Sequence, residues 1–198
     1  HPHFFMGRLR ESLRARHPAL LARLAAAGAG EGRFIESLHP LARQRYRERP
    51  GDAALTSIAA RRPTFEWVLR AYVEERGLAR IESDCEVVGL IGRAATPEAP
   101  ARVEGVRVAR ADGRVEAAPA DVVIDASGRA GGLASELAAL GAPLAVEHHD
   151  AGIVYFTRHY ELLPGREPPS THGIPGLILA DFVVGALPAD SGTFTGTF

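Results

Sequence analysis

In the first part of the chain, the apolar residues follow a helical period in two places. Leucines at roughly helical spacing between Leu9 and Leu24 predict one helix, or two short ones with Pro18 in the first turn of the second, ending near Gly28. A second helix is predicted to open at residues 61–64 and to stop at Gly77. Its apolar stripe, spaced i, i+3, i+4, i+7 and i+8, consists of Phe65, Val68, Leu69, Tyr72 and Val73.

The remaining segments carry weaker patterns. The chain is expected to open directly on its first helix. Residues 30–60 lack apolar periodicity, which favours a loop-like surface with a short strand at 54–58. After Gly77 the pattern predicts a β-meander with turns at residues 96–100 and at Asp112-Gly113. Its strands are marked by Ile81, Val87, Val88, Leu90, Val103, Val106, Val108 and Val115.

The segment from Asp121 to Arg129 is the most informative for function. Its β-branched apolar run, residues 122–124, predicts a strand buried on both faces, because apolar residues follow one another without alternation. The small residues 126–128 then precede a predicted helix at 133–140. A strand that passes through a small-residue turn into a helix is how α/β proteins bring backbone N–H groups close to a phosphate or nucleotide.

The last part of the chain predicts an antiparallel sheet. Strands are expected at 152–162, 176–187 and 192–198, with a loop at 164–175 and a hairpin turn at 190–192. The whole order is helix, helix, β-meander, buried strand, helix, antiparallel sheet, and it predicts a mixed α/β fold.

Composition narrows the class of protein. The 198 residues are 46% hydrophobic and 24% charged, and 23 basic residues nearly balance 24 acidic ones, so no basic field favours nucleic acid. A single cysteine, Cys85, excludes an internal disulfide. No apolar run is long enough for a membrane span and no signal peptide is visible, so we expect a cytoplasmic protein. The start at His1 and the end in a Thr/Phe run predict a piece of a larger protein.

Metal and hydrolase chemistry find little support. Adjacent histidines in a strand point to opposite faces, and no third ligand has the spacing of a metal site, so no metal site is predicted for His1, His3, His148, His149 or Asp150. No serine lies in a Gly-x-Ser-x-Gly turn, which argues against a hydrolase.

Three segments, at residues 1–5, 61–66 and 121–129, follow one another in a characteristic order and spacing. Together they resemble the flavoprotein monooxygenases of the para-hydroxybenzoate hydroxylase fold, in particular the bacterial branch with squalene-epoxidase-like and polyether-type epoxidases. Residues 1–5 and the Leu/Arg helix after them resemble the family's Gln-Gly-Arg-His-x-His stretch. Residues 61–66, Arg-Arg-Pro-Thr-Phe-Glu, resemble its Ser-Arg-Pro-x-Leu-Glu helix start. Residues 121–129 resemble its Asp-Ala-Ser-Gly-Arg block, with residues 140–143 and 155–158 continuing the likeness into the substrate-domain sheet.

The resemblance implies the central part of a two-domain flavoprotein that binds FAD and NAD(P)H. Residues 1–142 would form an incomplete FAD-binding domain, and residues 143–198 the start of the substrate-binding sheet. The activity implied is hydroxylation or epoxidation of an apolar or aromatic small molecule with NAD(P)H and O₂. Aromatic residues of the sheet are candidate lining of the substrate pocket: Tyr155, Phe156, Tyr160 and Phe182.

The resemblance also implies cofactor-binding residues, each beside a simpler reading. Arg62 would approach the flavin pyrophosphate, or is a solvated residue before a helix; Val87 would present its backbone to adenine, or is a core valine. Asp125 either faces the ligand or caps the turn through its own side chain. The wall beside the ADP half of the flavin, or otherwise a packed turn, would consist of Ala126, Ser127 and Gly128.

Two departures from the family pattern leave other functions open. The Gly-x-Gly-x-x-Gly unit is absent, and residues 28–32 do not replace it because they follow a helix, so FAD binding by this chain alone is expected to be weak or absent. Ser127 stands where many relatives carry Asp. The alternatives are a flavin-dependent reductase or halogenase-like oxidoreductase, or a truncated module without catalysis.

Overall fold

The computed structural model describes residues 2–128, 131–166, 176–178, 180–181 and 183–198. These residues form six α-helices and three antiparallel sheets, so the predicted mixed α/β class is confirmed. The chain divides into two compact units, residues 1–80 with 152–198 and residues 81–151. The functional division at residue 142 into cofactor and substrate domains stays a prediction.

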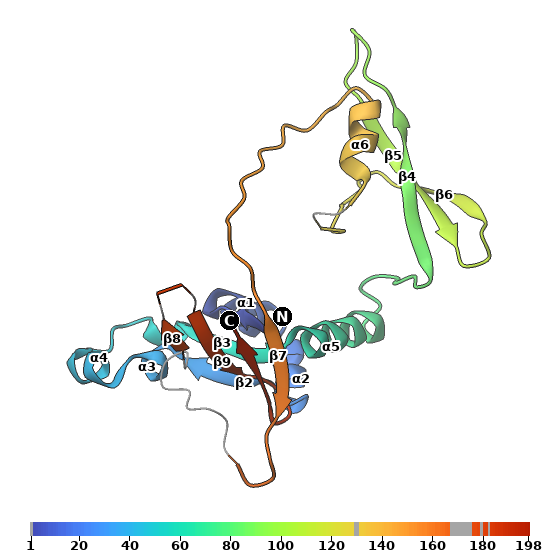
Figure 1. Ribbon diagram of the computed structural model, residues 1–198. Coiled ribbons are helices and arrows are strands. Elements are labelled where there is room, and N and C mark those ends of the chain that lie inside the picture. The colour runs from blue at the N-terminus through green and yellow to red at the C-terminus, as the bar shows by residue number, and fades with distance from the viewer. Residues whose placement is uncertain (1, 129–130, 167–175, 179, 182) are drawn as a thin grey trace. The chain divides into compact units, whose positions relative to one another are not determined.

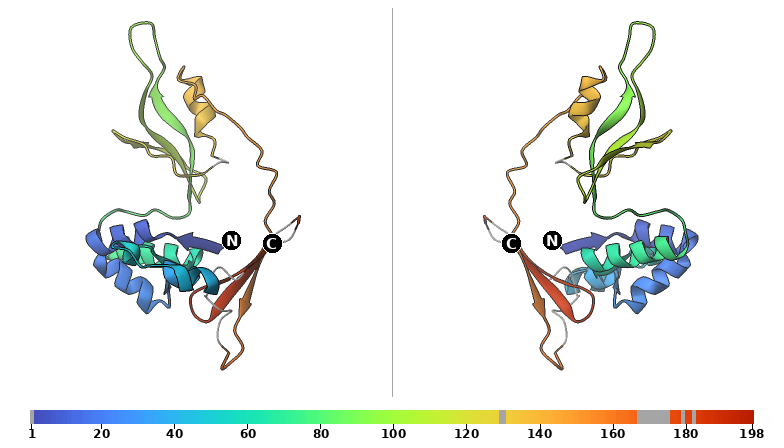
Figure 2. Two further views of the ribbon diagram at one scale, coloured as in Figure 1. Left: turned by 90° about the vertical axis from the view of Figure 1, so that its left-hand side faces the viewer. Right: turned by 90° about the vertical axis from the view of Figure 1, so that its right-hand side faces the viewer.

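The first unit contains a three-stranded sheet, β1 (Pro2–Phe5), β3 (Thr56–Arg61) and β2 (Gly30–Arg33), with β3 in the middle. Helices α1 (Gly7–Arg16), α2 (Pro18–Ala26) and α5 (Arg62–Glu75) lie close to this sheet and to one another (Figures 1 and 2). Their apolar faces meet β3 in one core, which consists of Leu13, Leu20, Leu24, Ile58, Ala60, Phe65, Val68 and Tyr72.

Both predicted helices of this unit are confirmed. His17 separates α1 from α2, and Pro18 begins α2 where its missing N–H costs no helical hydrogen bond. Gly28, with φ +89°, follows the end of α2. In α5, Pro63 lies in the first turn and the predicted stripe supplies the buried face.

Residues 30–60 were predicted as loop-like with a short strand at 54–58; the strand is present as β3, but the loop-like prediction for the rest was wrong. Besides β2 they contain α3 (Phe34–Ser37), α4 (Pro40–Arg45), a 3₁₀ turn (Asp52–Ala54) and β3. The sequence Gly-Glu-Gly-Arg of β2 shows no apolar alternation, because this strand forms through backbone pairing with β3. Helix α4 buries none of its residues, so its sequence has no apolar stripe from which a helix could be predicted. The chain also opens on β1 and not on a helix.

The second sheet of this unit has the order β7-β10-β9-β8. Its strands are β7 (Thr157–Glu161), β8 (Gly176–Ile178), β9 (Val183–Pro188) and β10 (Thr193–Thr197). The antiparallel sheet and its hairpin turn at 190–192 are confirmed, and Ser191 and Gly192 both have positive φ there. The strand predicted at 176–187 is two paired strands, and the one predicted at 152–162 is shorter.

The second unit contains the predicted β-meander, β4 (Cys85–Arg93), β5 (Arg102–Arg110) and β6 (Val115–Pro119), paired in that order. Gly113, with φ +82°, lies in the β5–β6 turn. Helix α6 (Leu133–Ala139) closely matches its predicted range and packs against β4.

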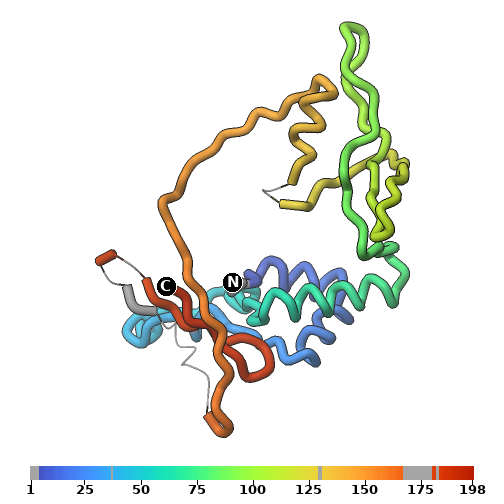
Figure 3. Tube along the Cα trace, turned by 45° about the vertical axis from the view of Figure 1, so that its right-hand side comes forward, coloured from blue at the N-terminus to red at the C-terminus, as the bar shows by residue number. Residues whose placement is uncertain are grey.

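The buried strand predicted at residues 122–124 is wrong. The segment is a loop between β6 and α6 (Figure 3), and the side chains of Val122 and Ile124 are 74% and 85% exposed. The reason that these residues form no strand lies in strand β5. The β5–β6 ladder ends where the Ala120 N–H donates to the Glu104 carbonyl, because β5 begins only two residues before Glu104. Without a partner strand, β-branched residues do not form a sheet.

Candidate functional site

The candidate site is the turn at residues 125–128 in the second unit. The backbone N–H and the hydroxyl of Ser127 both donate to Asp125 Oδ1, at 2.9 and 2.6 Å. Gly128 follows with φ +84°, a conformation that favours glycine. Of the two readings for Asp125, its carboxylate therefore does cap the turn, and the hydrogen bonds from the Ser127 side chain and backbone lower its pKa.

Gly131, three residues after Gly128, lies close to this turn again. The Gly131 N–H donates to the Gly128 carbonyl at 3.1 Å. A Cβ on Gly131 would lie 2.0 Å from Ser127 Oγ, so a larger residue here would displace the Ser127 hydroxyl from its present position. The turn is thus a tight backbone loop whose side chains remain exposed to solvent.

Helix α6 fixes the far end of this loop to the meander. Glu136 Oε2 accepts a hydrogen bond from the Leu90 N–H at 3.3 Å and lies 3.5 Å from Arg107 Nη2. At the end of the helix, the Leu140 carbonyl accepts from the Ala95 N–H at 2.8 Å. The contacts of Glu136 are to β4 and β5, and that of Leu140 is to a residue shortly after β4, so the loop is held at one end by a sheet.

The chemistry of the turn is that of a hydrogen-bond acceptor. Asp125 is ionised above its lowered pKa, and the Ser127 hydroxyl uses its proton on Asp125 while keeping its lone pairs. A carboxylate disfavours a phosphate and favours ligand groups that donate, such as sugar hydroxyls. This local chemistry suits the ribose or ribityl hydroxyls of a dinucleotide better than its pyrophosphate.

The other two candidate residues, Arg62 and Val87, belong to other elements than this turn. Arg62 is the first residue of α5 in the first unit, 61% exposed, with Nε 2.5 Å from Glu66 Oε1. Val87 lies in β4 of the second unit, opposite Val108, with its side chain 48% exposed. Val87 is therefore not a fully buried core residue, and its role toward adenine stays a prediction.

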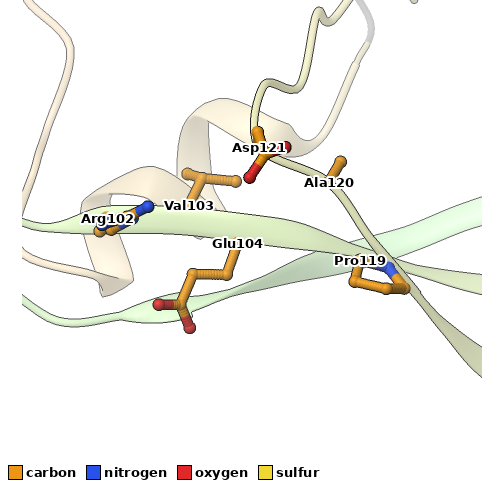
Figure 4. A pocket seen from close by; sticks show the side chains of 6 residues that line it. All are labelled: Arg102, Val103, Glu104, Pro119, Ala120 and Asp121. Atoms are coloured by element: carbon orange, nitrogen blue, oxygen red, sulfur yellow. The ribbon is translucent and has the colours of Figure 1, made fainter.

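A shallow hollow of about 340 Å³ lies where β5 and β6 meet the candidate loop (Figure 4). Val103 and Glu104 point to opposite sides of β5, and Asp121 opens the loop above the strand. Glu104 is also 2.8 Å from Arg93, so part of the charge here is compensated. The lining is polar and of mixed charge, and consists of Arg102, Val103, Glu104, Pro119, Ala120 and Asp121.

Sequence reasoning missed the most strongly bonded carboxylate of the described chain, Asp190 in the β9–β10 turn. It is 1% exposed and accepts from the backbone N–H of Arg61 at 2.6 Å and from its Nη2 at 2.8 Å. Thr64 Oγ1 donates to the same carboxylate at 2.8 Å. The only signal in the sequence was the turn pattern Asp-Ser-Gly, which does not reveal a partner 129 residues away.

The predicted aromatic lining is largely open to solvent. Tyr155, Phe156 and Tyr160 are 60%, 61% and 43% exposed, so they are not plain core residues. Phe182 lies outside the described residues.

Comparison with models of protein families finds no match to this chain, and comparison with curated proteins finds none either. Within the described part of the chain, no group of three or more His, Cys, Asp and Glu side chains is arranged to hold a metal ion. Over the same residues, no helix combines the length and apolar character needed to cross a membrane.

Proposed function

We propose that this chain contributes cofactor and substrate contacts to an FAD-dependent monooxygenase that hydroxylates or epoxidises an apolar small molecule with NAD(P)H and O₂. The observation that carries the proposal is the Asp125–Ser127 turn, a tight, solvent-open loop between a β-meander and a helix. It lies within the segment that resembles the family's Asp-Ala-Ser-Gly-Arg block. When bound, the flavin supplies the oxygen and redox chemistry, and the protein orients it.

Each unit, taken by itself, holds residues whose chemistry suits one part of a flavin dinucleotide. The acceptor groups of Asp125 and Ser127 fit sugar hydroxyls, and the absent Cβ at Gly131 lets the backbone approach closely. Arg62 fits a phosphate, because its guanidinium is always charged and its present partner, Glu66, is an exposed residue 57% accessible to solvent. An exposed ion pair of this kind exchanges readily for a stronger phosphate contact.

The proposal is tested by the visible absorbance spectrum of the complete protein. We expect bound-flavin bands at about 370 and about 450 nm that are bleached by NAD(P)H. A folded protein that stays colourless after addition of FAD would leave a likeness of fold alone and would favour the non-catalytic alternative.

Arg62→Ala is expected to weaken FAD binding by the complete protein about tenfold, because a charge-assisted contact to phosphate is lost. Arg70→Ala is the matched control. Arg70 lies on the same helix with a similar i, i+4 pair, its Nε 3.0 Å from Glu74 Oε1, but eight residues further from the helix start. Titration of the flavin fluorescence measures both variants, and equal effects of the two would remove Arg62 from the cofactor site.

A further inference from the structure

The first unit exposes a dense group of arginines around α4. Residues 40–49, which comprise this helix and the segment directly after it, contain four arginines and one glutamate. Figure 1 shows α4 beside α3, at the margin of the unit. The positive charge is local, because basic and acidic residues nearly cancel over the whole chain. All four arginines are exposed, and they are Arg43, Arg45, Arg47 and Arg49.

The side chains of the segment after α4 alternate in direction. The backbone leaves the helix in an extended conformation at Tyr46, whose hydroxyl donates to Asp52 at 2.8 Å. Glu48 also turns toward the protein, with its carboxylate 3.3 Å from Arg33. In an extended chain the residues between them point the other way, to solvent. This outward side, about 13 Å long and here called the arginine row, consists of Arg45, Arg47 and Arg49.

The carboxylates near the arginine row already have partners. Glu36 and Glu48 both lie close to Arg33, at 4.0 and 3.3 Å. Asp52 accepts one hydrogen bond from the Tyr46 hydroxyl and one from a backbone N–H. Within the part of the chain that the structure describes, no carboxylate forms an ion pair with Arg43, Arg45 or Arg47. Their charge is therefore available to an external anion.

Large apolar side chains lie exposed beside these arginines. Leu41, on α4, is 66% exposed. Leu55 is 50% exposed, and its carbonyl accepts from the Phe34 N–H at 3.0 Å. The Phe34 ring lies 6.0 Å from that of Tyr46, so this apolar group adjoins the arginine row. Leucine and phenylalanine side chains gain free energy when they leave water.

This combination of groups matches the surface of an anionic membrane. There the guanidinium groups pair with lipid phosphates, while apolar side chains enter the boundary of the acyl chains. A single small anion would need guanidinium groups that converge, whereas the arginine row spreads them over about 13 Å. A nucleic acid would satisfy the arginines through its phosphates, but it would leave Leu41 and Leu55 in water.

We propose that the arginine row and Arg43, together with Phe34, Leu41 and Leu55, dock this protein on the surface of an anionic lipid membrane. The proposal deepens the proposed function, because an apolar substrate dissolves among the acyl chains and would be met at this surface. It rests on the proposed function only for the substrate, since docking itself needs no flavin.

The test is co-sedimentation of the complete protein with vesicles of phosphatidylcholine alone, or of equal parts phosphatidylcholine and phosphatidylglycerol. We expect binding to the anionic vesicles and its loss at about 1 M salt, where charges are screened beyond about 3 Å. Arg45→Gln/Arg47→Gln should weaken the binding about thirtyfold, since each charge near the surface contributes about fivefold. Leu41→Ala should weaken it about fivefold, because less apolar surface is buried.

Arg14→Gln/Arg16→Gln is the matched control. It removes two charges from exposed positions in the last turn of α1, in the same unit, and should bind the anionic vesicles like the wild type. The proposal is overturned if the wild type does not bind these vesicles, or if both double variants are weakened equally. It is also overturned if duplex DNA binds as tightly as the vesicles and Leu41→Ala changes neither, which would make the arginine row a nucleic-acid surface.

The same preparations separate this proposal from the proposed function. A protein that binds anionic vesicles through the arginine row yet never binds FAD would contradict the proposed function and not the docking surface. A flavin-containing protein that does not bind the vesicles would contradict the docking surface alone.

Discussion

Asp190→Ala is expected to lower the free energy of unfolding of the first unit by about 3 kcal/mol, because it removes one partner of a buried ion pair. The Asp190 carboxylate is 1% exposed and joins the β9–β10 turn to Arg61 and Thr64 at the start of α5. Its loss leaves the Arg61 backbone N–H and the Thr64 hydroxyl without their acceptor. The Arg61 side chain is 38% exposed and can return to water, which places the expected loss at the lower end of the range for buried pairs.

The same carboxylate predicts an acid-dependent loss of stability. Burial by itself raises the pKa of Asp190, but the hydrogen bonds from Arg61 and Thr64 outweigh it and hold the pKa at about 2, below the usual 3.8. A carboxylate with a depressed pKa stabilises the fold fully above pH 4, and this contribution is lost as the pH falls from about 4 to about 2. The difference corresponds to about 2.5 kcal/mol, comparable with the loss expected from Asp190→Ala.

Chemical denaturation of the wild type and of Asp190→Asn between pH 2 and 7 measures both effects. The wild type should lose stability below about pH 4, and the variant should be less stable at pH 7 with a flatter profile in this window. Asp112→Asn is the matched control, since Asp112 also lies in a hairpin turn and pairs with an arginine, at 2.6 Å, but with both side chains exposed. Parallel acid profiles for wild type and Asp190→Asn would show that another group carries the transition.

The difference between elements that were predicted and those that were not lies in the range of the interactions that form them. The local sequence of helix α5 is enough to predict it, because Pro63 marks its start and the stripe from Phe65 to Val73 marks its buried face. The β-branched run at residues 122–124 can form a strand only beside a partner strand, and its own sequence does not specify that partner. These residues are exposed in the structure because the pairing of β5 with β6 ends before them. The sequence of residues 122–124 does not show where that pairing ends.

The same difference between local and long-range interactions separates the side-chain contacts that could be predicted from those that could not. The Asp125–Ser127 bond spans two residues, so turn chemistry alone made it one of two readings. The Asp190–Arg61 bond spans 129 residues and requires the fold. Tyr160 of β7 was a predicted aromatic residue, but its stacking on Phe194 of β10 depends on the register of the two strands, which only their pairing defines.

Leu24→Ala is expected to lower the free energy of unfolding of the first unit by about 3–5 kcal/mol. Leu24 is fully buried, on the face of α2 that meets Ile58 of β3. Removing its side chain loses the transfer free energy of the buried methyl groups and leaves a cavity. The core around it holds eight buried residues in all, so one leucine is a large share of it.

The residues around Leu24 determine how far the protein can relax into the cavity and so regain part of the lost stability. A groove of about 260 Å³ already lies beside it, lined by residues of α2 together with Ala29, Gly30 and Ile58. Truncation would join the new cavity to this groove and admit water to the side of Ile58, so we expect little recovery by collapse. Leu41→Ala is the matched control, because Leu41 is 66% exposed on α4 and its truncation should change the stability by less than about 0.5 kcal/mol. A loss below about 1 kcal/mol in Leu24→Ala would mean that the core of the first unit does not rest on the contact between α2 and β3.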